Sequence, residues 1–246
     1  MLTNRYKNTI EYLAHKQLAE GITPTHLVAR MQSFVKEQPF EIQKTLSQNW
    51  LLQTHKFTLI PEDLYAKGMG KNLLSYTTRL EEGDHIFTDH WDNRGIIVVY
   101  AIPKVLIDVL RNEFSGSTFN HGATAFNNVY TLYPQSDTMA WLHLDEKEID
   151  FWIASKGEVL FYNKFQYTTE EDILYFVLFA LEQNSILPTD LLLRISGFCL
   201  KGDKLYNLLE QYIGEVREME LPSTFNTNQK ISPREVRQHI NLLGAL

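Results

Sequence analysis

Residues 139–165 read MAWLHLDEKEIDFWIASKGEVLFYNKF, and this segment indicates the architecture of a large part of the chain. Two short polar segments, residues 145–148 and 156–157, have turn composition and separate three runs rich in β-branched and aromatic residues. The pattern predicts an antiparallel meander with strands over residues 139–144, 149–155 and 158–165. Large apolar side chains occur in both alternating registers, so we expect both faces of this sheet to be covered, at least partly.

The chain after this meander alternates between helices and strands. Residues 168–171 have the pattern of a capping box, in which Thr168 and Glu171 bond each other's backbone amides, and they predict a helix over residues 169–184. Its central run ILYFVLFAL is apolar on nearly every side, so we expect this helix to be the buried centre of its lobe. The order β-β-β-α-β-α-β is completed by a strand at residues 191–196, a helix at 204–213 and a strand at 216–221.

The chain before residue 139 is expected to combine helices and strands in a first lobe. Capping residues, prolines, hydrophobic periodicity and turn composition place these elements. We expect helices over residues 24–38, 40–52, 67–80, 103–114 and 123–132, and strands over residues 55–60, 86–91, 95–102 and 115–119. Residues 1–20 fit either a strand or an amphipathic helix. Residues 232–235 form a second capping box, which predicts a helix packed against one lobe, with a partner-binding helix as the alternative.

Composition and charge exclude several classes of protein. The 246 residues carry a net charge of −7, and no window concentrates enough Lys and Arg to follow a nucleic acid backbone. Cys199 is the only cysteine, which excludes an internal disulfide framework and a cysteine-based zinc site and suits a reducing compartment. Residues 1–20 lack a signal-peptide core and no apolar run is long enough for a membrane span. We therefore expect a cytoplasmic protein that is neither exported nor embedded in a membrane.

Two segments carry a resemblance to a known family, residues 56–61 (KFTLIP) and residues 165–175 (FQYTTEEDILY). The chain resembles uncharacterised Bacteroidetes proteins with an actin-like fold, distant structural relatives of the pilus-assembly protein PilM and of the cytoplasmic domain of the secretion protein GspL. The resemblance implies an α/β protein with a two-lobed actin-like ATPase (ribonuclease H-like) fold and mixed sheets. We expect a first lobe at residues 1–135, a second lobe at 136–221, and a C-terminal tail and helix at 222–246 that pack back.

The resemblance raises the question of ATP, because actin-type ATPases hold the nucleotide between their lobes with two Asp-x-Gly turns. Residues 1–20 contain no Asp-x-Gly, and the matching second-lobe turn at residues 145–148 carries acids that would repel a polyphosphate. Ser196 and Gly197 resemble the loop on the adenosine side. Asp145, Ser196 and Gly197 are therefore the candidates for a cofactor site. We predict no bound cofactor, with Mg-ATP as the alternative.

Other reactive residue types have ordinary structural explanations. Residues 68–72, GMGKN, lack the first glycine and the Ser or Thr of a P-loop. The acids and histidines of residues 84–92 fit a solvated hairpin better than a metal site, and His121 and His143 fit a turn and a strand. Cys199 has no histidine partner nearby in sequence, and Asp145 and Asp150 are too isolated for a magnesium site of the ribonuclease H type. We predict no catalytic residue and no metal site.

Aromatic residues make up 12% of the chain, and many cluster around the meander and the helix that follows it. Most are expected in the core, but exposed aromatic side chains without convergent polar groups are typical of protein interfaces. We therefore expect a cytoplasmic, non-catalytic scaffold or adaptor with a degenerate actin-like ATPase fold that binds another protein. The alternative is a divergent nucleotide-binding protein that uses the interlobe cleft.

Overall fold

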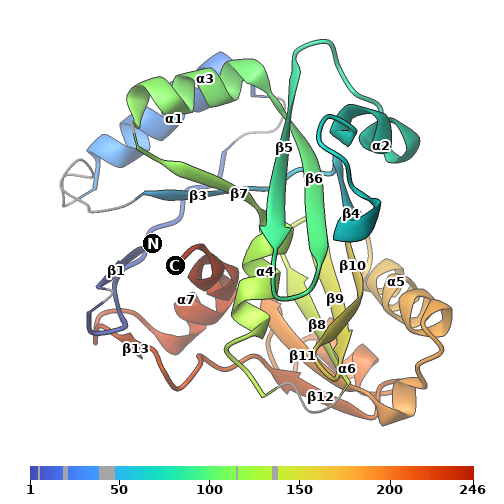
Figure 1. Cartoon of the computed structure of the whole chain (residues 1–246). Helices are drawn as coiled ribbons and strands as arrows, with labels where there is room; N and C mark the ends of the chain where they lie inside the picture. Colours follow the sequence, from blue (N-terminus) through green and yellow to red (C-terminus); the bar gives the residue numbers. More distant parts are fainter. Residues whose placement is uncertain (5, 19–21, 39–47, 115, 135–137) are drawn as a thin grey trace. The chain divides into compact units, whose positions relative to one another are not determined.

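The computed structural model describes residues 1–4, 6–18, 22–38, 48–114, 116–134 and 138–246 (Figure 1). Contacts between residues divide the chain into two compact units. Unit 1 contains residues 1–13 and 126–244, and unit 2 contains residues 14–125 and 245–246. The lobes expected at residues 1–135 and 136–221, with the tail at 222–246, stay a prediction.

Unit 1 is built around a five-stranded mixed sheet with the strand order β10-β9-β8-β11-β12 (Figure 1). The pairs β8–β9 and β9–β10 are antiparallel, as the meander predicts, and β11 runs parallel to both β8 and β12. Because β11 runs parallel to β8, the connection from β10 to β11 must cross the sheet, and helix α5 lies in this connection. The elements are Met139–Leu144 (β8), Glu148–Ser155 (β9), Glu158–Gln166 (β10), Glu170–Gln183 (α5), Leu192–Gly197 (β11) and Glu215–Glu218 (β12).

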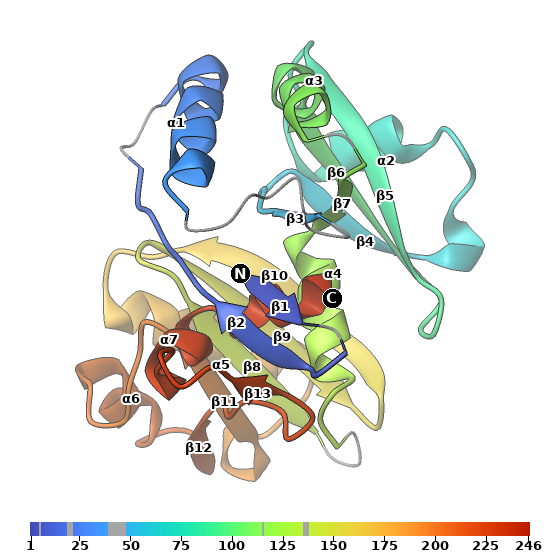
Figure 2. The same ribbon diagram turned by 90° about the vertical axis from the view of Figure 1, so that its left-hand side faces the viewer.

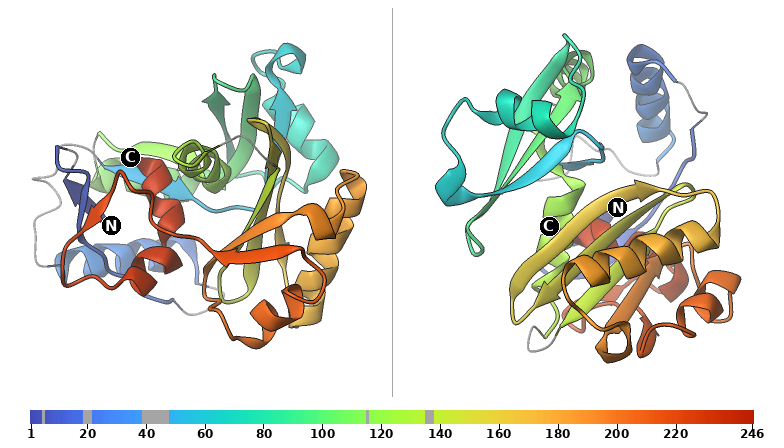
Figure 3. Two further views of the ribbon diagram at one scale, coloured as in Figure 1. Left: turned by 90° about the horizontal axis from the view of Figure 1, so that it is seen from below. Right: turned by 90° about the vertical axis from the view of Figure 1, so that its right-hand side faces the viewer.

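Helices α5 and α6 cover one face of this sheet (Figure 3). Leu142 and Phe151 of the sheet share a hydrophobic core with Val177 of α5. On the opposite face, Trp141 packs against Phe126 of α4, with ring centroids 4.4 Å apart. All six residues of β8 are buried, so the expectation that the sheet is covered on both faces is confirmed at its centre. The helices added here are Gly122–Tyr130 (α4) and Lys204–Leu209 (α6), and a short 3-10 helix, Pro188–Asp190, precedes β11.

Helix α5 differs from its expected form in two ways. Thr169 and Asp172 make its capping box, one residue later than the expected Thr168 and Glu171. The Asp172 amide donates to Thr169 Oγ1 at 3.2 Å, and the Thr169 amide donates to Asp172 Oδ2 at 2.9 Å. The helix is also not buried on all sides, because it lies over the sheet with one side only and leaves two aromatic side chains exposed. The expectation that this helix is the buried centre of its lobe is therefore wrong for its outer side.

A second sheet of unit 1 has the strand order β1-β2-β13 (Figure 2). β1 and β2 form an antiparallel hairpin, so the described part of residues 1–20 contains strands instead of an amphipathic helix. Helix α7 begins at the predicted capping box of Ser232 and Glu235 and packs against β11. The elements are Leu2–Asn4 (β1), Thr9–Tyr12 (β2), Asn226–Thr227 (β13), Pro233–Gln238 (α7) and the 3-10 helix Ile240–Ala245.

Unit 2 contains a three-stranded antiparallel sheet with the order β4-β6-β5 and a parallel pair of β3 with β7. Helix α2 packs on the sheet through Leu74, which shares a small core with Val99 and Ala101. Helices α1 and α3 contact each other. The elements are Pro24–Lys36 (α1), Asn49–Leu52 (β3), Phe57–Pro61 (β4), the 3-10 helix Glu62–Leu64, Gly70–Thr77 (α2), Asp84–Trp91 (β5), Ile96–Pro103 (β6), Lys104–Glu113 (α3) and Thr118–His121 (β7).

One expected helix is a strand over its final residues. The sequence predicts a helix over residues 40–52, of which 40–47 lie outside the described residues and Asn49–Leu52 form β3. β3 pairs with β7, and Thr118 Oγ1 donates to Asn49 Oδ1 across 69 positions of sequence. Because its partner strand is so distant along the chain, local periodicity did not indicate this pairing.

Candidate functional site

A row of four polar side chains crosses the main sheet of unit 1 from β10 to β11. In the strand pairing, Lys164 lies opposite Asp150, Asp150 lies opposite His143, and His143 lies beside Ser196. Directly paired residues point to the same face of a sheet, so all four side chains lie on the face away from α5 and α6. None is more than 5% exposed. Buried polar groups are stable only when they are paired, so the partners of this polar row determine its role.

Lys164 and Asp150 form the charged end of the polar row. Lys164 Nζ lies 3.3 Å from Asp150 Oδ2 and 2.8 Å from Glu148 Oε2, and the Tyr162 hydroxyl donates to Asp150 Oδ1 at 2.6 Å. Burial opposes the charge on Lys164, but the carboxylates outweigh burial and hold the pKa of Lys164 above its ordinary value. Burial and the neighbouring Asp150 carboxylate raise the pKa of Tyr162. The amine is therefore charged and the phenol neutral at neutral pH.

His143 and Ser196 form the neutral end of the polar row. Trp141 Nε1 donates to Ser196 Oγ at 2.7 Å, and Ser196 Oγ lies 2.7 Å from His143 Nδ1. An indole offers no acceptor, so Ser196 Oγ accepts from Trp141, and its contact with His143 Nδ1 is a second hydrogen bond of the same hydroxyl, with the donor set by the imidazole tautomer. Burial lowers the pKa of His143, although the nearby acids act in the opposite direction. The ring is therefore neutral at neutral pH.

Ser196, His143 and Asp150 are the three residue types of a catalytic triad, but their geometry differs from one. In a triad, the serine hydroxyl faces the substrate and the carboxylate orients the imidazole. Here Ser196 is 0% exposed, and Asp150 is bonded to Tyr162 and Lys164. The polar row therefore links four strands as a buried network and presents no nucleophile at the surface.

The three candidate cofactor residues lie together at the carboxyl ends of β8 and β11. Gly197 pairs with Leu144, so Asp145 follows β8 next to the point where Ser196 and Gly197 end β11. Gly197 has a φ of +87°, and a Cβ there would overlap the Leu144 carbonyl, which also accepts from the Phe198 amide at 2.9 Å. The close approach of two strands therefore explains this glycine without any ligand.

The turn after β8 is closed by its own hydrogen bonds. The Asp145 amide donates to the Glu148 carbonyl at 2.9 Å, and the Tyr167 hydroxyl donates to the carbonyl oxygens of Asp145 and Glu146 at 2.8 and 3.0 Å. An actin-type phosphate loop needs free amides and a glycine, whereas this turn offers three carboxylates. Mg-ATP, which the fold implies, does not fit this turn. The assignment of Asp145, Ser196 and Gly197 as candidates for a cofactor site stays a prediction.

Asp89 organises a second buried polar cluster, in unit 2. Its carboxylate accepts from the Tyr100 hydroxyl at 3.1 Å, from the His121 amide at 2.7 Å and from the Thr124 hydroxyl at 2.6 Å. His121 ends β7 and Thr124 lies in the first turn of α4, so Asp89 ties the start of that helix to β5. Burial outweighs these hydrogen bonds and raises the pKa of Asp89. The Asp89 carboxylate is therefore occupied by hydrogen bonds from within the protein.

The acids and histidines of residues 84–92 do not converge on one point. Burial raises the pKa of Asp84, but an ion pair with Lys56 at 2.6 Å and a hydrogen bond from the Glu81 amide outweigh burial and lower it overall. Asp89 belongs to the cluster above, and the two histidines of the segment are exposed. Within the described ranges of the chain, no group of three or more His, Cys, Asp or Glu side chains is placed to hold a metal ion.

The remaining residues singled out in the sequence have internal roles. The Ala123 amide donates to His121 Nδ1 at 3.0 Å, so the proton lies on Nε2, which donates to the Thr54 carbonyl at 3.1 Å. Burial raises the pKa of the Cys199 thiol to about 12, which keeps it from acting as a thiolate at neutral pH. Gly70 begins α2, where a Cβ would crowd side chains of β5 and β6, so this glycine serves packing.

A pocket of about 410 Å³ lies in unit 2 and offers no unpaired ammonium group. Both of its lysines form ion pairs, Lys56 with Asp84 at 2.6 Å and Lys104 with Asp108 at 2.5 Å. Its lining residues are Lys56, Glu81, Gly83, Asp84, Pro103, Lys104, Val105 and Asp108.

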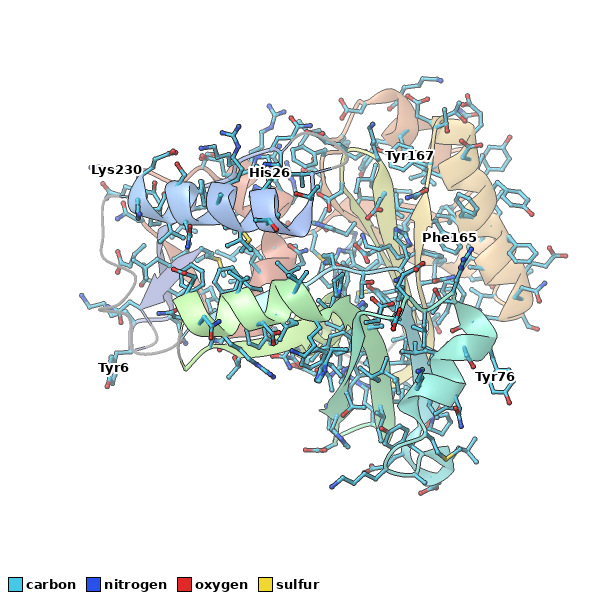
Figure 4. The ribbon with its side chains drawn as sticks, turned by 90° about the horizontal axis from the view of Figure 1, so that it is seen from above. Tyr6, His26, Tyr76, Phe165, Tyr167 and Lys230 are labelled. Carbon is cyan, nitrogen blue, oxygen red and sulfur yellow. The ribbon has the colours of Figure 1, made fainter. Side chains whose placement is uncertain are left out.

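Helix α5 exposes an aromatic surface in unit 1. Tyr175 and Phe179, one turn apart, are 61% and 46% exposed, and their stacked rings have centroids 5.9 Å apart. We call these two residues the aromatic stripe. Beneath the stripe, Phe176 stacks on Phe165 of β10 at 4.5 Å, and Phe165 lies beside α5 in Figure 4. The two rings lie on the side of α5 away from the buried Val177, and their i, i+4 spacing places them together without indicating which side of this apolar run is exposed.

The main sheet of unit 1 has three antiparallel strands followed by the parallel strands β11 and β12, and a family model matches most of the chain that contains it. A family model described as "Protein of unknown function (DUF3822)" matches residues 1–216. The chain belongs to the DUF3822 family. A search of curated proteins finds no match to this DUF3822 member. Among the helices that the structure describes, none has the length and apolar character needed to cross a bilayer.

Solved structures place the DUF3822 chain in a known fold class. It is similar to a Bacteroides thetaiotaomicron protein described as having an actin-like ATPase fold and unknown function, with a TM-score of 0.73 and 18% identity over 83% of this chain and 79% of that chain. It is also similar to a chain of a PilM-PilN type IV pilus biogenesis complex, with a TM-score of 0.53 and 12% identity over 93% of this chain and 88% of that chain. The expected α/β fold of actin-like ATPase type, with mixed sheets in two lobes, and the structural likeness to PilM are confirmed.

Proposed function

We propose that this protein is a non-catalytic scaffold or adaptor that has the actin-like ATPase fold and binds another protein in the cytoplasm. The observation that carries the proposal is that the groups at the carboxyl ends of β8 and β11 already bond to, or pack against, other parts of the protein. The Ser196 hydroxyl is bonded to Trp141 and His143, and Gly197 packs against β8. The turn between β8 and β9 is closed and acidic. An ATPase of this fold needs phosphate-binding amides at such a place, so the arrangement favours binding of a protein over hydrolysis.

Two further observations support a role in an assembly. The aromatic stripe on α5 exposes two large rings, and exposed aromatic side chains are enriched at protein interfaces. The PilM-PilN complex adds an analogy, since a chain of similar fold is part of a protein complex there. The aromatic stripe lies outside the polar row.

The alternative, a divergent nucleotide-binding protein, requires phosphate-binding groups from other segments. The charge of unit 1 disfavours it, because this unit contains 12 Lys and Arg against 18 Asp and Glu. Such an excess of negative charge repels a polyphosphate and attracts positively charged partners.

Thermal unfolding of the purified chain with and without Mg-ATP, Mg-ADP and Mg-GTP tests the choice between the two functions. A nucleotide that binds only the folded state, at about a hundredfold excess over its Kd, stabilises that state by about 2.7 kcal/mol. We expect no shift in the unfolding temperature with any of the three. A shift of several degrees with one nucleotide, absent with magnesium alone, contradicts the proposal.

A second measurement tests the scaffold role directly. Gel filtration of an extract from the native host, followed by detection of this chain, is expected to show a complex with another protein that persists when nucleotide is removed by dialysis. Elution of the whole population as a free single chain, in extracts prepared at low and at physiological salt, contradicts a scaffold role.

A further inference from the structure

The exposed side of α5 carries four residues in one line, Glu171, Tyr175, Phe179 and Glu182. Successive members are four, four and three positions apart, and such spacings keep side chains on the same side of a helix. All four are exposed. The aromatic stripe therefore has one carboxylate beyond each of its ends. Figure 3 shows that α5 covers the outside of the sheet, so this line is directed away from the core of unit 1.

The rings of the aromatic stripe are fixed by a chain of ring contacts. Tyr175 is stacked with Phe179, with an interplanar angle of 18°, and lies edge-on to Phe176 with centroids 5.7 Å apart. Phe176 stacks on Phe165, which in turn stacks on Phe161 of the same strand, with centroids 6.4 Å apart. Rings that are already ordered lose little conformational entropy when a partner covers them, which makes them suitable anchors.

The surroundings of the aromatic stripe are acidic. Helix α5 carries Glu170, Glu171 and Asp172 in its first turn and Glu182 near its end, and it contains no Lys or Arg. Lys204 Nζ lies 2.9 Å from Glu170 and 3.3 Å from Glu171, so the two glutamates share this lysine. Glu182 makes no ion pair with any residue that the structure describes. An apolar centre with negative ends is complementary to an apolar segment with positive ends.

We propose that the aromatic stripe receives a basic amphipathic helix of the partner protein; this inference rests on the proposed scaffold function. Apolar side chains of that helix lie against Tyr175 and Phe179, and one Arg or Lys lies beside each of Glu171 and Glu182. A helix fits because the stripe follows the axis of α5, along which two helices pack with their side chains interdigitated. An arginine there also contacts the exposed ring faces.

The spacing of the two glutamates gives the partner segment a recognisable pattern. Glu171 and Glu182 are eleven positions apart, which corresponds to about 16 Å along a helix axis at about 1.5 Å per residue. A partner helix packed alongside α5 therefore needs two basic residues about eleven positions apart with apolar residues between them, roughly three turns of helix. This pattern can be searched for in any protein that co-purifies with the chain.

Two other occupants of the aromatic stripe are disfavoured by the same charges. If a second copy of this chain packed α5 against α5, each glutamate would face a glutamate of the other copy in either relative direction, and like charges repel. An anionic membrane surface attracts basic segments and repels this acidic face. A positively charged protein segment is the occupant that the charges favour.

A binding experiment with the full chain tests the inference. The probe is a synthetic fluorescent helical peptide in which two arginines about eleven residues apart flank leucines at the intervening stripe positions. A matched peptide has glutamates in place of the arginines. Fluorescence anisotropy at low ionic strength is expected to show binding of the arginine peptide and at least about tenfold weaker binding of the glutamate peptide, with affinity falling as salt is added. Equal binding of the two peptides overturns the proposal.

Variants of the chain assign the binding to the aromatic stripe. Tyr175→Ala with Phe179→Ala, and separately Glu182→Lys, are each expected to weaken binding of the arginine peptide at least about tenfold. Tyr212→Ala removes another exposed tyrosine of unit 1, 48% exposed, and is expected to leave the affinity unchanged. All the replaced side chains are exposed, so thermal unfolding should confirm that each variant is folded. Unchanged affinity in the double variant, or an equal loss with Tyr212→Ala, overturns the proposal.

A photo-crosslinking residue at the exposed position of Gln183, introduced in the native host, identifies the natural occupant. Mass spectrometry of the crosslinked peptide is expected to show a partner segment with the basic pattern described above. A crosslink to a second copy of the chain, to lipid or to an acidic segment overturns the inference. A host complex that persists in the double variant would also overturn it while leaving the scaffold function intact, whereas the absence of any host complex would remove the scaffold function itself.

Discussion

Lys164 and Asp150 form an ion pair inside the main sheet of unit 1, with Nζ 3.3 Å from Oδ2 and both side chains 1% exposed. The lysine lies on β10, the strand at one edge of the sheet, and the aspartate lies on the neighbouring β9. A charge that points inward from an edge strand discourages that strand from pairing with another sheet, because a wrong register would bury the charge alone. The pair therefore helps to define the register of the β9–β10 hairpin.

Removal of one partner of this ion pair is expected to destabilise the protein strongly. Lys164→Met leaves the carboxylates of Asp150 and Glu148 without their buried cation, and loss of one member of a buried pair typically costs about 3 to 5 kcal/mol. Urea unfolding followed by circular dichroism measures the loss. A loss below about 1 kcal/mol, the range of exposed pairs, would contradict the structural role assigned to the pair.

A double variant separates the pair from its surroundings. Lys164→Met combined with Asp150→Leu replaces both charges with apolar groups, and we expect it to lose less stability than the sum of the two single variants, because neither charge is then left alone. Lys204→Met breaks an exposed ion pair with Glu170 and is the matched control, for which we expect an unfolding midpoint close to that of the wild type.

The stability of the protein is expected to decrease as the pH falls through the range in which histidine binds a proton. The pKa of histidine in an unfolded chain is about 6.5, and burial lowers the pKa of His143 in the folded state. Above about pH 6.5 neither state binds this proton. Below it the unfolded state is protonated first, so the contribution of His143 to stability is lost as the pH falls toward its folded pKa.

Urea unfolding of the wild type and of His143→Gln at several pH values measures this effect. Glutamine keeps a hydrogen-bonding group near Ser196 but does not titrate, so the variant should lose less stability than the wild type between about pH 7 and pH 5. Identical pH dependence in the two proteins would contradict a lowered pKa for His143.

Much of the fold could be predicted because its elements carry local patterns. The strand alternation and turns of residues 139–165 predicted the meander, and the capping box at Ser232 predicted the start of α7. These features depend on residues close together in sequence. β3 could not be found in the same way, because Asn49 of β3 pairs with Thr118 of β7, which lies 69 positions further along the chain.

The candidate site was harder to predict than the fold. His143 and Asp150 are ordinary polar interruptions of two strands in the sequence, and only the strand register places them opposite each other. The same limitation applies to Gly197, which reads as part of a loop but is needed because Leu144 lies against it. Exposure of one side of α5 also depends on tertiary packing, because a run that is apolar on all sides does not show which side faces the sheet.

The position of the capping box on α5 gives a direct comparison of two adjacent residues. Thr169→Ala removes the oxygen that accepts from the Asp172 amide, and we expect it to destabilise the protein by about 1 kcal/mol. The Thr168 side chain makes no hydrogen bond to a described residue, so Thr168→Ala should have almost no effect. Urea unfolding midpoints of the two variants decide between the two cap positions, and a larger loss for Thr168→Ala would support the position expected from sequence.

Gly197 and Gly202 allow the effect of strand packing to be separated from that of backbone conformation. Both have positive φ values, +87° and +96°, but a Cβ on Gly197 would overlap the Leu144 carbonyl whereas a Cβ on Gly202 would meet nothing within 4 Å. Gly202→Ala should therefore destabilise the protein only by the conformational penalty of about 1 to 2 kcal/mol. Gly197→Ala carries the same penalty and must also separate β8 from β11, so its loss in urea unfolding should be clearly larger. Equal losses would mean that backbone conformation alone requires this glycine, and would reopen the question of whether a ligand approaches it at the end of β11.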